Sequence, residues 1–193
     1  MKSSLITSVL GAGLLLGATA GAAPARADTA GEPRGHCVVD LSASGTTCFG
    51  TVREAISHAT HGQVTDAPLT ARAALTDRTL TAKLEGPQSA GQGLAVAYVL
   101  SIEYRYPNKD GETITFTGPQ PCVEDGQRDY LVNDVRDRDP WWNDRISSFQ
   151  GYNTCDVNHY EHTVANGGDT TGPRRSMNDM GAMNNRTTGL TWG

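Results

Sequence analysis

Two short runs of oxygen-bearing side chains have the composition of a cation site. Residues 143–148 read Asn-Asp-Arg-Ile-Ser-Ser, and residues 184–189 read Asn-Asn-Arg-Thr-Thr-Gly. Each run places two Asn or Asp residues, two spacers and then a hydroxyl residue. Calcium takes about six to eight oxygen ligands from carboxylates, amides, carbonyls and water. The runs therefore predict calcium binding. The expected ligands are Asn143, Asp144, Arg145, Ser147, Asn184, Asn185, Arg186 and Thr188. Arg145 and Arg186 would contribute their backbone carbonyl oxygens.

The two runs differ in charge. Asp144 is the only carboxylate in the first run, and the second run has none. Calcium affinity falls as ligand charge falls, so we expect dissociation constants of about 10⁻⁴ to 10⁻³ M, with the tighter site at the first run. The alternative is that both runs only form turns, which Asn, Asp and Ser favour for backbone reasons.

A second pair of similar segments lies upstream of the runs. Tyr104 is followed by Gly111, and Tyr160 is followed by Gly167, so a glycine stands at the eighth position in both segments. Self-similarity at a period of about 40 to 50 residues is typical of two copies of one supersecondary unit. The combined pattern resembles the βγ-crystallin family, in which a hairpin with an aromatic residue and a glycine precedes an Asn/Asp-Asn/Asp-x-x-Ser/Thr-Ser calcium-binding run.

This resemblance implies a mainly β fold. Two Greek-key motifs would form a β-sandwich over residues 94–193, with motif one at 94–150 and motif two at 151–193. It also implies that hairpin carbonyls near Tyr106 and His162 contribute to the ion sites.

The chain departs from the family pattern at three positions. The first run matches the pattern at each fixed position, whereas the second run ends in Gly189 where the family has serine. Lys109 and Ala165 replace the second aromatic residue of the two hairpins. These differences bear on the affinity of the second site more than on the fold.

The N-terminal segment has the features of a secretory signal peptide. Lys2 precedes an apolar stretch over residues 5–23, and Ala25 and Ala27 supply small residues before Asp28. A signal peptide at 1–27 is expected, and with it a secreted, extracellular protein. A membrane-spanning segment is the alternative, but the stretch is short and rich in alanine and glycine.

Composition limits the classes of partner. The chain has 193 residues with 37% hydrophobic content, enough for the core of one domain of ordinary size or one with an appended subdomain. The 16 Lys and Arg residues face 21 Asp and Glu residues. No nucleic acid is expected as a partner, because phosphate binding relies on clustered basic residues. No membrane partner is expected either.

Four cysteines predict two disulfides, because an even number in an exported chain is typical of an oxidising compartment. Three pairings are open. A turn-prone stretch between Cys37 and Cys48 favours a bridge between them, which leaves Cys122 to pair with Cys155. Metal binding by cysteine is the alternative, but no C-x-x-C spacing is present.

The region before the sandwich divides in two. Residues 28–68 should hold a small hairpin and a helix at 52–60, because Thr51 and Glu54 form a capping box and Gly62 follows the helix. Residues 69–93 resemble a linker with one strand at 79–84. Strands are predicted further along the chain by alternating and β-branched residues, at 94–104, 113–117, 146–149, 157–160 and 187–192.

No enzyme is expected. The chain lacks a nucleophile elbow and a P-loop, and His159 and His162 stand three residues apart instead of the four that a zinc-protease helix needs. A secreted, non-enzymatic calcium-binding module is the leading interpretation. The alternative is a protease inhibitor or killer-toxin-like protein, since such secreted proteins are similar to this fold, with an extracellular metalloprotease as partner. A third hypothesis makes residues 28–93 a removable pro-region.

Overall fold

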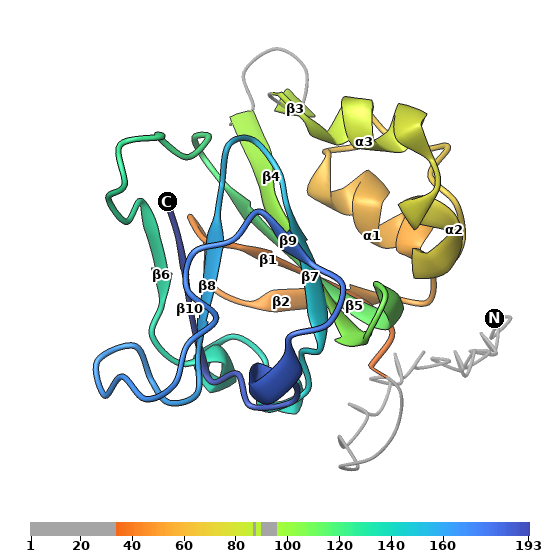
Figure 1. The fold of residues 1–193 in the computed structure, drawn as a ribbon. Coiled ribbons are helices and arrows are strands. Elements are labelled where there is room, and N and C mark those ends of the chain that lie inside the picture. The colour runs from red at the N-terminus through yellow and green to blue at the C-terminus, as the bar shows by residue number, and fades with distance from the viewer. Residues whose placement is uncertain (1–33, 87, 90–95) are drawn as a thin grey trace, which may run out of the picture.

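The computed structural model describes residues 34–86, 88–89 and 96–193 (Figure 1). The expected signal peptide at 1–27 and the expected mature start at Asp28 lie outside the described residues. Strands make up 32% of the chain and helices 19%, so the predicted mainly β class is confirmed.

The larger sheet has seven strands in the order β2-β1-β5-β4-β7-β9, with β3 pairing with β4. The β1–β5 pair is parallel and the other pairs are antiparallel, so the sheet is mixed. The N-terminal hairpin thus extends the same sheet as the hairpin of β4 and β5. The strands span His36–Asp40 (β1), Thr46–Phe49 (β2), Gln88–Ser89 (β3), Val96–Tyr106 (β4), Asp110–Gly118 (β5), Ser148–Gly151 (β7) and Ser176–Met177 (β9).

The smaller sheet has three strands in the order β6-β10-β8. They span Tyr130–Val132 (β6), Val157–Tyr160 (β8) and Gly189–Trp192 (β10). β6 comes from the first half of residues 96–193 but pairs with β10 of the second half. Conversely, β9 of the second half pairs with β7 of the first. Each half therefore gives one strand to the sheet of the other, which interlocks the two halves.

The helices α1 (Val52–Ala59), α2 (Ala71–Leu75) and α3 (Arg78–Leu84) cover the outer face of the larger sheet (Figure 1). Helix α1 has the predicted capping box, in which the Thr51 hydroxyl accepts from the Glu54 amide and the Glu54 carboxylate accepts from the Thr51 amide. Gly62 follows it with φ +80°, as a glycine beyond a helix end allows.

The strand predicted at 79–84 is wrong, because this segment belongs to helix α3. The side chain of Asp77 accepts from the amides of Thr79 and Leu80 and caps the helix. Leu80 and Leu84 stand four residues apart and are both buried, so they form one apolar helix face. The threonines that suggested a strand do not outweigh this cap and this spacing.

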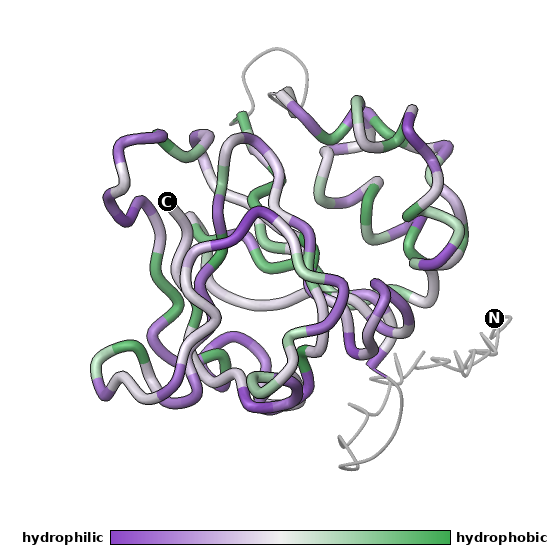
Figure 2. Tube along the Cα trace, viewed as in Figure 1, coloured by the Kyte–Doolittle hydropathy of each residue, from purple (hydrophilic) through white to green (hydrophobic). Residues whose placement is uncertain are grey.

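The smaller sheet, the larger sheet and the helices form three layers, and a hydrophobic core lies between each pair of neighbouring layers. The core between the sheets includes Phe116, Trp142, Phe149 and Trp192. The core between the larger sheet and the helices includes Ile56, Leu84 and Ile102 from facing elements. Figure 2 shows hydrophobic stretches in the central strands and the helices, and mostly hydrophilic outer loops.

Both predicted disulfides are present. Cys37 and Cys48 face each other in the register of β1 and β2. Cys122 and Cys155 join the segment before β6 to the turn between β7 and β8. Two disulfides are compatible with an extracellular protein. Within the described residues, the helices are too short or too polar to cross a bilayer.

Gly151 of β7 is expected to tolerate no side chain. A Cβ atom there would collide with the carbonyl oxygen of Cys155 and lie 3.1 Å from that of Arg175. Both are backbone atoms that cannot rotate away. Gly151→Ala should therefore lower the free energy of unfolding by about 1 to 3 kcal/mol, the range for overpacking. Gly50→Ala is the matched control, since its Cβ would meet only the Glu54 side chain at 3.7 Å. Urea denaturation of both variants measures this, and equal stability would contradict the packing described here.

Candidate functional site

The two oxygen-rich runs have the same local geometry. A 3₁₀ turn precedes each run, η2 (Pro140–Trp142) before the first and η3 (Gly181–Met183) before the second. Asn143 has φ −59° and ψ 128°, and Asn184 has φ −58° and ψ 124°. Asp144 and Asn185 both have φ +56°, a left-handed conformation that Asp and Asn tolerate better than most residues. The repeat seen in the sequence is therefore also a repeat of backbone conformation.

The runs lie against each other through reciprocal backbone hydrogen bonds. The Asp144 amide donates to the Thr187 carbonyl at 3.0 Å, and the Asn185 amide donates to the Ile146 carbonyl at 2.9 Å. When the two runs are aligned, Asp144 corresponds to Asn185 and Ile146 to Thr187, so the two hydrogen bonds are equivalent. The two runs are thus related by a local twofold symmetry.

Each run is also fixed to its own hairpin in the same way. The Ser147 amide donates to the Tyr104 carbonyl, and the Thr188 amide donates to the Tyr160 carbonyl, both at 2.9 Å. Tyr104 and Tyr160 are the equivalent tyrosines of the two hairpins predicted from the sequence. Hairpin and run therefore meet in both halves, as the predicted repeat requires.

Four oxygen atoms converge around Ser147 and form what we name the serine cluster. The Ser147 hydroxyl lies 2.7 Å from the Arg105 carbonyl oxygen, 2.6 Å from Asn184 Oδ1 and 3.1 Å from Asn185 Oδ1. A hydroxyl has one proton to donate, so it satisfies one of these three acceptors at a time. Ser147 is 1% exposed. The cluster thus has more acceptors than donors, which is the arrangement that a cation would satisfy.

The second run forms an equivalent threonine cluster. The Thr188 hydroxyl donates to Asn143 Oδ1 at 3.0 Å, and Asn143 Nδ2 donates to Asp144 Oδ2 at 2.7 Å. The cluster opens onto a hollow of about 440 Å³ that Glu161 and His162 also line. Two carboxylates, Asp144 and Glu161, therefore lie near this cluster together with the arginines Arg136 and Arg186, whereas the four oxygens of the serine cluster are all uncharged.

The structure groups the predicted ligands differently from the sequence. The Ser147 hydroxyl faces the amides of Asn184 and Asn185, and the Thr188 hydroxyl faces the amide of Asn143, so neither run forms a site by itself. The Asp144 carboxylate consequently lies beside Thr188 and not beside Ser147. The expectation of a tighter site at the first run rested on a grouping that the fold does not produce, because it treated neighbours in sequence as neighbours in space.

The two arginines of the runs make other contacts. The Arg145 guanidinium lies 4.8 Å from the centroid of a Trp141 ring and donates to the Trp141 carbonyl. The Arg186 guanidinium pairs with Glu161 and lowers the pKa of that carboxyl below its usual range. Within the described residues, the recorded hydrogen bonds of the Ser147 and Thr188 hydroxyls involve neither arginine.

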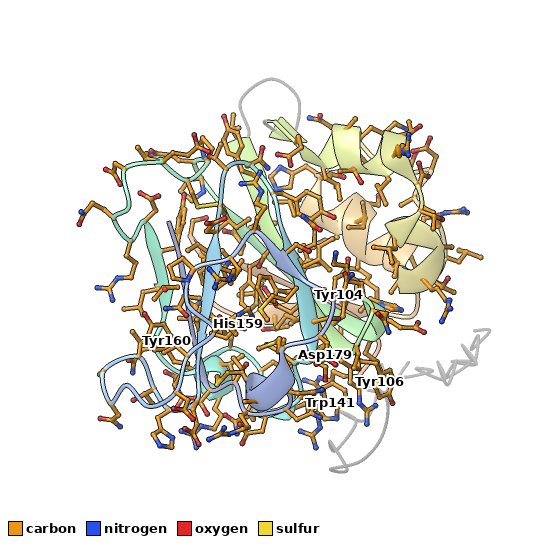
Figure 3. The ribbon with its side chains drawn as sticks, in the orientation of Figure 1. Tyr104, Tyr106, Trp141, His159, Tyr160 and Asp179 are labelled. Carbon is orange, nitrogen blue, oxygen red and sulfur yellow. A yellow bond between two sulfur atoms is a disulfide. The ribbon has the colours of Figure 1, made fainter. Side chains whose placement is uncertain are left out.

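The positive charge near the serine cluster is partly compensated. The Arg105 guanidinium lies 5.1 Å from the ring centroids of both Tyr106 and Trp141, and Figure 3 labels these two rings beside each other. The same guanidinium pairs with Glu112 at 2.9 Å. The backbone carbonyl of Arg105 faces the cluster, while its guanidinium is paired with Glu112.

The rings that cover the hairpin glycines belong to Tyr106 and His162. A Cβ atom at Gly111 would collide with the ring of Tyr106, and one at Gly168 would lie 3.0 Å from the ring of His162. Tyr104, the tyrosine of the predicted pair, is instead buried against the helices. In each segment the ring over the glycine thus belongs to the residue two positions after the tyrosine.

A buried polar chain crosses the core between the sheets, and no spacing in the sequence predicted it. The Trp192 indole donates to the Ser101 hydroxyl at 2.9 Å, and that hydroxyl donates to Glu103 at 2.6 Å. The other Glu103 oxygen lies 2.9 Å from His159 Nε2. Ser101, Glu103 and His159 are all 0% exposed, and Figure 3 places His159 in the interior. These residue types serve catalysis elsewhere, but here all three side chains are fully buried and the serine donates to the carboxylate.

Comparison with known proteins adds no relative. No protein-family model matches the chain, and searches of curated proteins and of solved structures found no match.

The Glu103–His159 pair is expected to show strong coupling. His159→Leu leaves a buried carboxylate without its partner and should cost about 3 to 5 kcal/mol of unfolding free energy. Replacing both residues, as Glu103→Met with His159→Leu, should restore much of that loss, because apolar pairs often replace buried ion pairs at little cost. Chemical denaturation of the parent, the single variant and the double variant measures this, with His58→Leu as an exposed control. A double variant less stable than the single one would contradict the pairing.

Proposed function

We propose that this chain is a secreted, non-enzymatic calcium-binding module of the βγ-crystallin type. The observation that carries the proposal is the serine cluster, in which the Ser147 hydroxyl has three acceptor oxygens within 3.1 Å and one proton. A calcium ion in this place would be coordinated by oxygen atoms alone, which is the donor type it prefers. Water molecules would complete the shell.

The strand order supports the βγ-crystallin assignment. In the first half, β4 and β5 form a hairpin, β6 crosses to the smaller sheet, and β7 returns to pair with β4. In the second half, β9 crosses to the larger sheet and β10 returns to pair with β8. A four-stranded unit whose last strand returns beside its first is the pattern of a Greek key. Residues 170 and 174, which bridge to β8, occupy the place of the missing second strand.

The proposed ion would join the two halves of the chain. The serine cluster takes its hydroxyl and its carbonyl from the first half and its two amide oxygens from the second. An ion bound there stabilises the native state by mass action, because the unfolded chain does not hold these oxygens together. The module would thus become more rigid in a calcium-rich extracellular fluid, and the two disulfides suit the same compartment.

Charge sets the proposed order of affinity. The serine cluster has no carboxylate, so it should bind calcium weakly, with a dissociation constant of about 10⁻³ M. The threonine cluster has the Asp144 carboxylate beside Asn143, and it should be the tighter of the two. The Glu161 carboxylate adds less there, because it is already paired with Arg186.

Calcium is expected to raise the melting temperature through the serine cluster. With about 10 mM calcium and a dissociation constant near 1 mM, mass action adds about 1.4 kcal/mol. For a chain of this size the shift is about 3 to 6 °C. Ser147→Ala should remove this part of the shift and leave the part that comes from the tighter threonine cluster, whereas Ser44→Ala, an exposed position on the turn between β1 and β2, should leave the whole shift unchanged. Calorimetric melts in calcium and in chelator measure the difference. An identical melt of the parent in both solutions would refute the proposal.

The threonine cluster has its own test. Asp144→Asn removes the charge but keeps the size of the side chain and its tolerance of a positive φ. The variant should weaken the tighter calcium site about tenfold or more, because affinity follows ligand charge. Isothermal titration with calcium should then show one altered site and one unaltered site. Loss of the weaker site instead would contradict the assignment of Asp144 to Thr188.

A further inference from the structure

A small cavity lies between the helices and the larger sheet, remote from the core between the sheets. Its volume is about 100 Å³. Its apolar wall comes from α1, α3 and β4 and includes Ala55, Ile56, Leu80 and Ile102, each of which is at most 5% exposed. Such a wall excludes water well and offers contact to a small apolar group.

Lys109 brings a positive charge into this apolar cavity. It lies in the turn between β4 and β5 with φ +58°, lines the cavity, and is only 6% exposed. Its ammonium donates to Gln150 Oε1 at 3.1 Å. Burial lowers the pKa of the ammonium below its usual range. An ammonium has three donors, and this is the one acceptor that the described residues provide.

The described lining of the cavity holds no carboxylate that could balance this charge. Lys109 shares the cavity with uncharged polar residues, among them Tyr104, Thr115 and Tyr152. The nearest acidic residue in sequence, Asp110, pairs with Arg72 at 3.3 Å and accepts from the Gly111 amide. Buried charges in proteins are normally paired, because the desolvation of an unpaired charge costs several kcal/mol. An anion in the cavity would give Lys109 the partner that the described lining does not supply.

A second polar group in the cavity wall also lacks a partner. Thr115 is 1% exposed, and its hydroxyl makes no hydrogen bond within the described part of the chain. Buried hydroxyls are bonded in most native structures, and each exception needs a reason. Thr115 lies on β5, opposite Ile102 of β4, so it faces the same cavity as the apolar wall.

We propose that this cavity binds a short-chain monocarboxylate, with its carboxylate on the Lys109 ammonium and its alkyl end against Ile56 and Leu80. The size follows from the volume. A cavity of about 150 Å³ holds benzene, so about 100 Å³ fits roughly four or five non-hydrogen atoms. Acetate and propionate have that size. The site is independent of the calcium clusters, and neither proposal requires the other.

Titration with propionate tests this site on the whole chain. Isothermal titration at constant ionic strength should give a roughly millimolar dissociation constant. Propionamide has the same shape without the charge and should bind at least tenfold more weakly. Sodium chloride at equal concentration serves as the control for a general salt effect. Absence of propionate binding at about 50 mM, or equal binding of acid and amide, would overturn the proposal.

Two variants locate the binding. Lys109→Met removes the charge but keeps a long unbranched side chain at a position with φ +58°. It should reduce propionate affinity at least tenfold, whereas Lys83→Met on α3 should not change the affinity. Ala55→Leu fills the cavity from α1 and should also abolish propionate binding. Ala82→Leu, at an exposed position on α3, is the matched control and should leave binding unchanged. The pair at positions 55 and 82 decides the matter if Lys109→Met does not fold. Unchanged affinity in both Lys109→Met and Ala55→Leu would place the ligand elsewhere and refute the site.

Discussion

The reciprocal pairing of the two oxygen-rich runs is the constraint on which the site depends. Two backbone hydrogen bonds, from Asp144 to Thr187 and from Asn185 to Ile146, hold the runs face to face. The pairing requires a left-handed residue at the same place in each run, and Asp and Asn accept that conformation at low cost. With the backbone so fixed, each hydroxyl is carried to the amides of the opposite run. The chemistry of the clusters is thus a consequence of backbone geometry.

The same constraint explains why the two halves interlock. A run that faces its counterpart must lie where the halves meet, so the strands that flank it belong to different sheets. β6 and β9 each pair with a strand of the opposite half, and the core between the sheets draws Trp142, Phe149 and Trp192 from both halves. Neither half could close this core alone. The outer face of the larger sheet is closed separately, by the helices.

The sequence predicted those features that depend on short separations. Cysteine count and a turn-prone stretch led to both disulfides, a capping box to α1, and hydroxyl spacing to the two runs. It could not predict how the runs combine, because Ser147 meets Asn184 only after the strands have exchanged. The mistaken strand at 79–84 has a similar cause. Threonine favours strands only weakly. The helix is stabilised instead by the burial of Leu80 and Leu84 in the core beneath the helices, which is a tertiary effect.

The hairpin of β4 and β5 connects the two proposed sites. Its Arg105 carbonyl faces the serine cluster, where acceptors outnumber donors, and its Lys109 ammonium faces the helical layer, where a cation lacks an anion. The two deficits are opposite in sign, so one calls for a metal ion and the other for a carboxylate. An aromatic side chain at position 109 would bring no charge to the cavity. Lysine instead leaves both space and an unbalanced charge, and these two properties together define a binding site more narrowly than either alone.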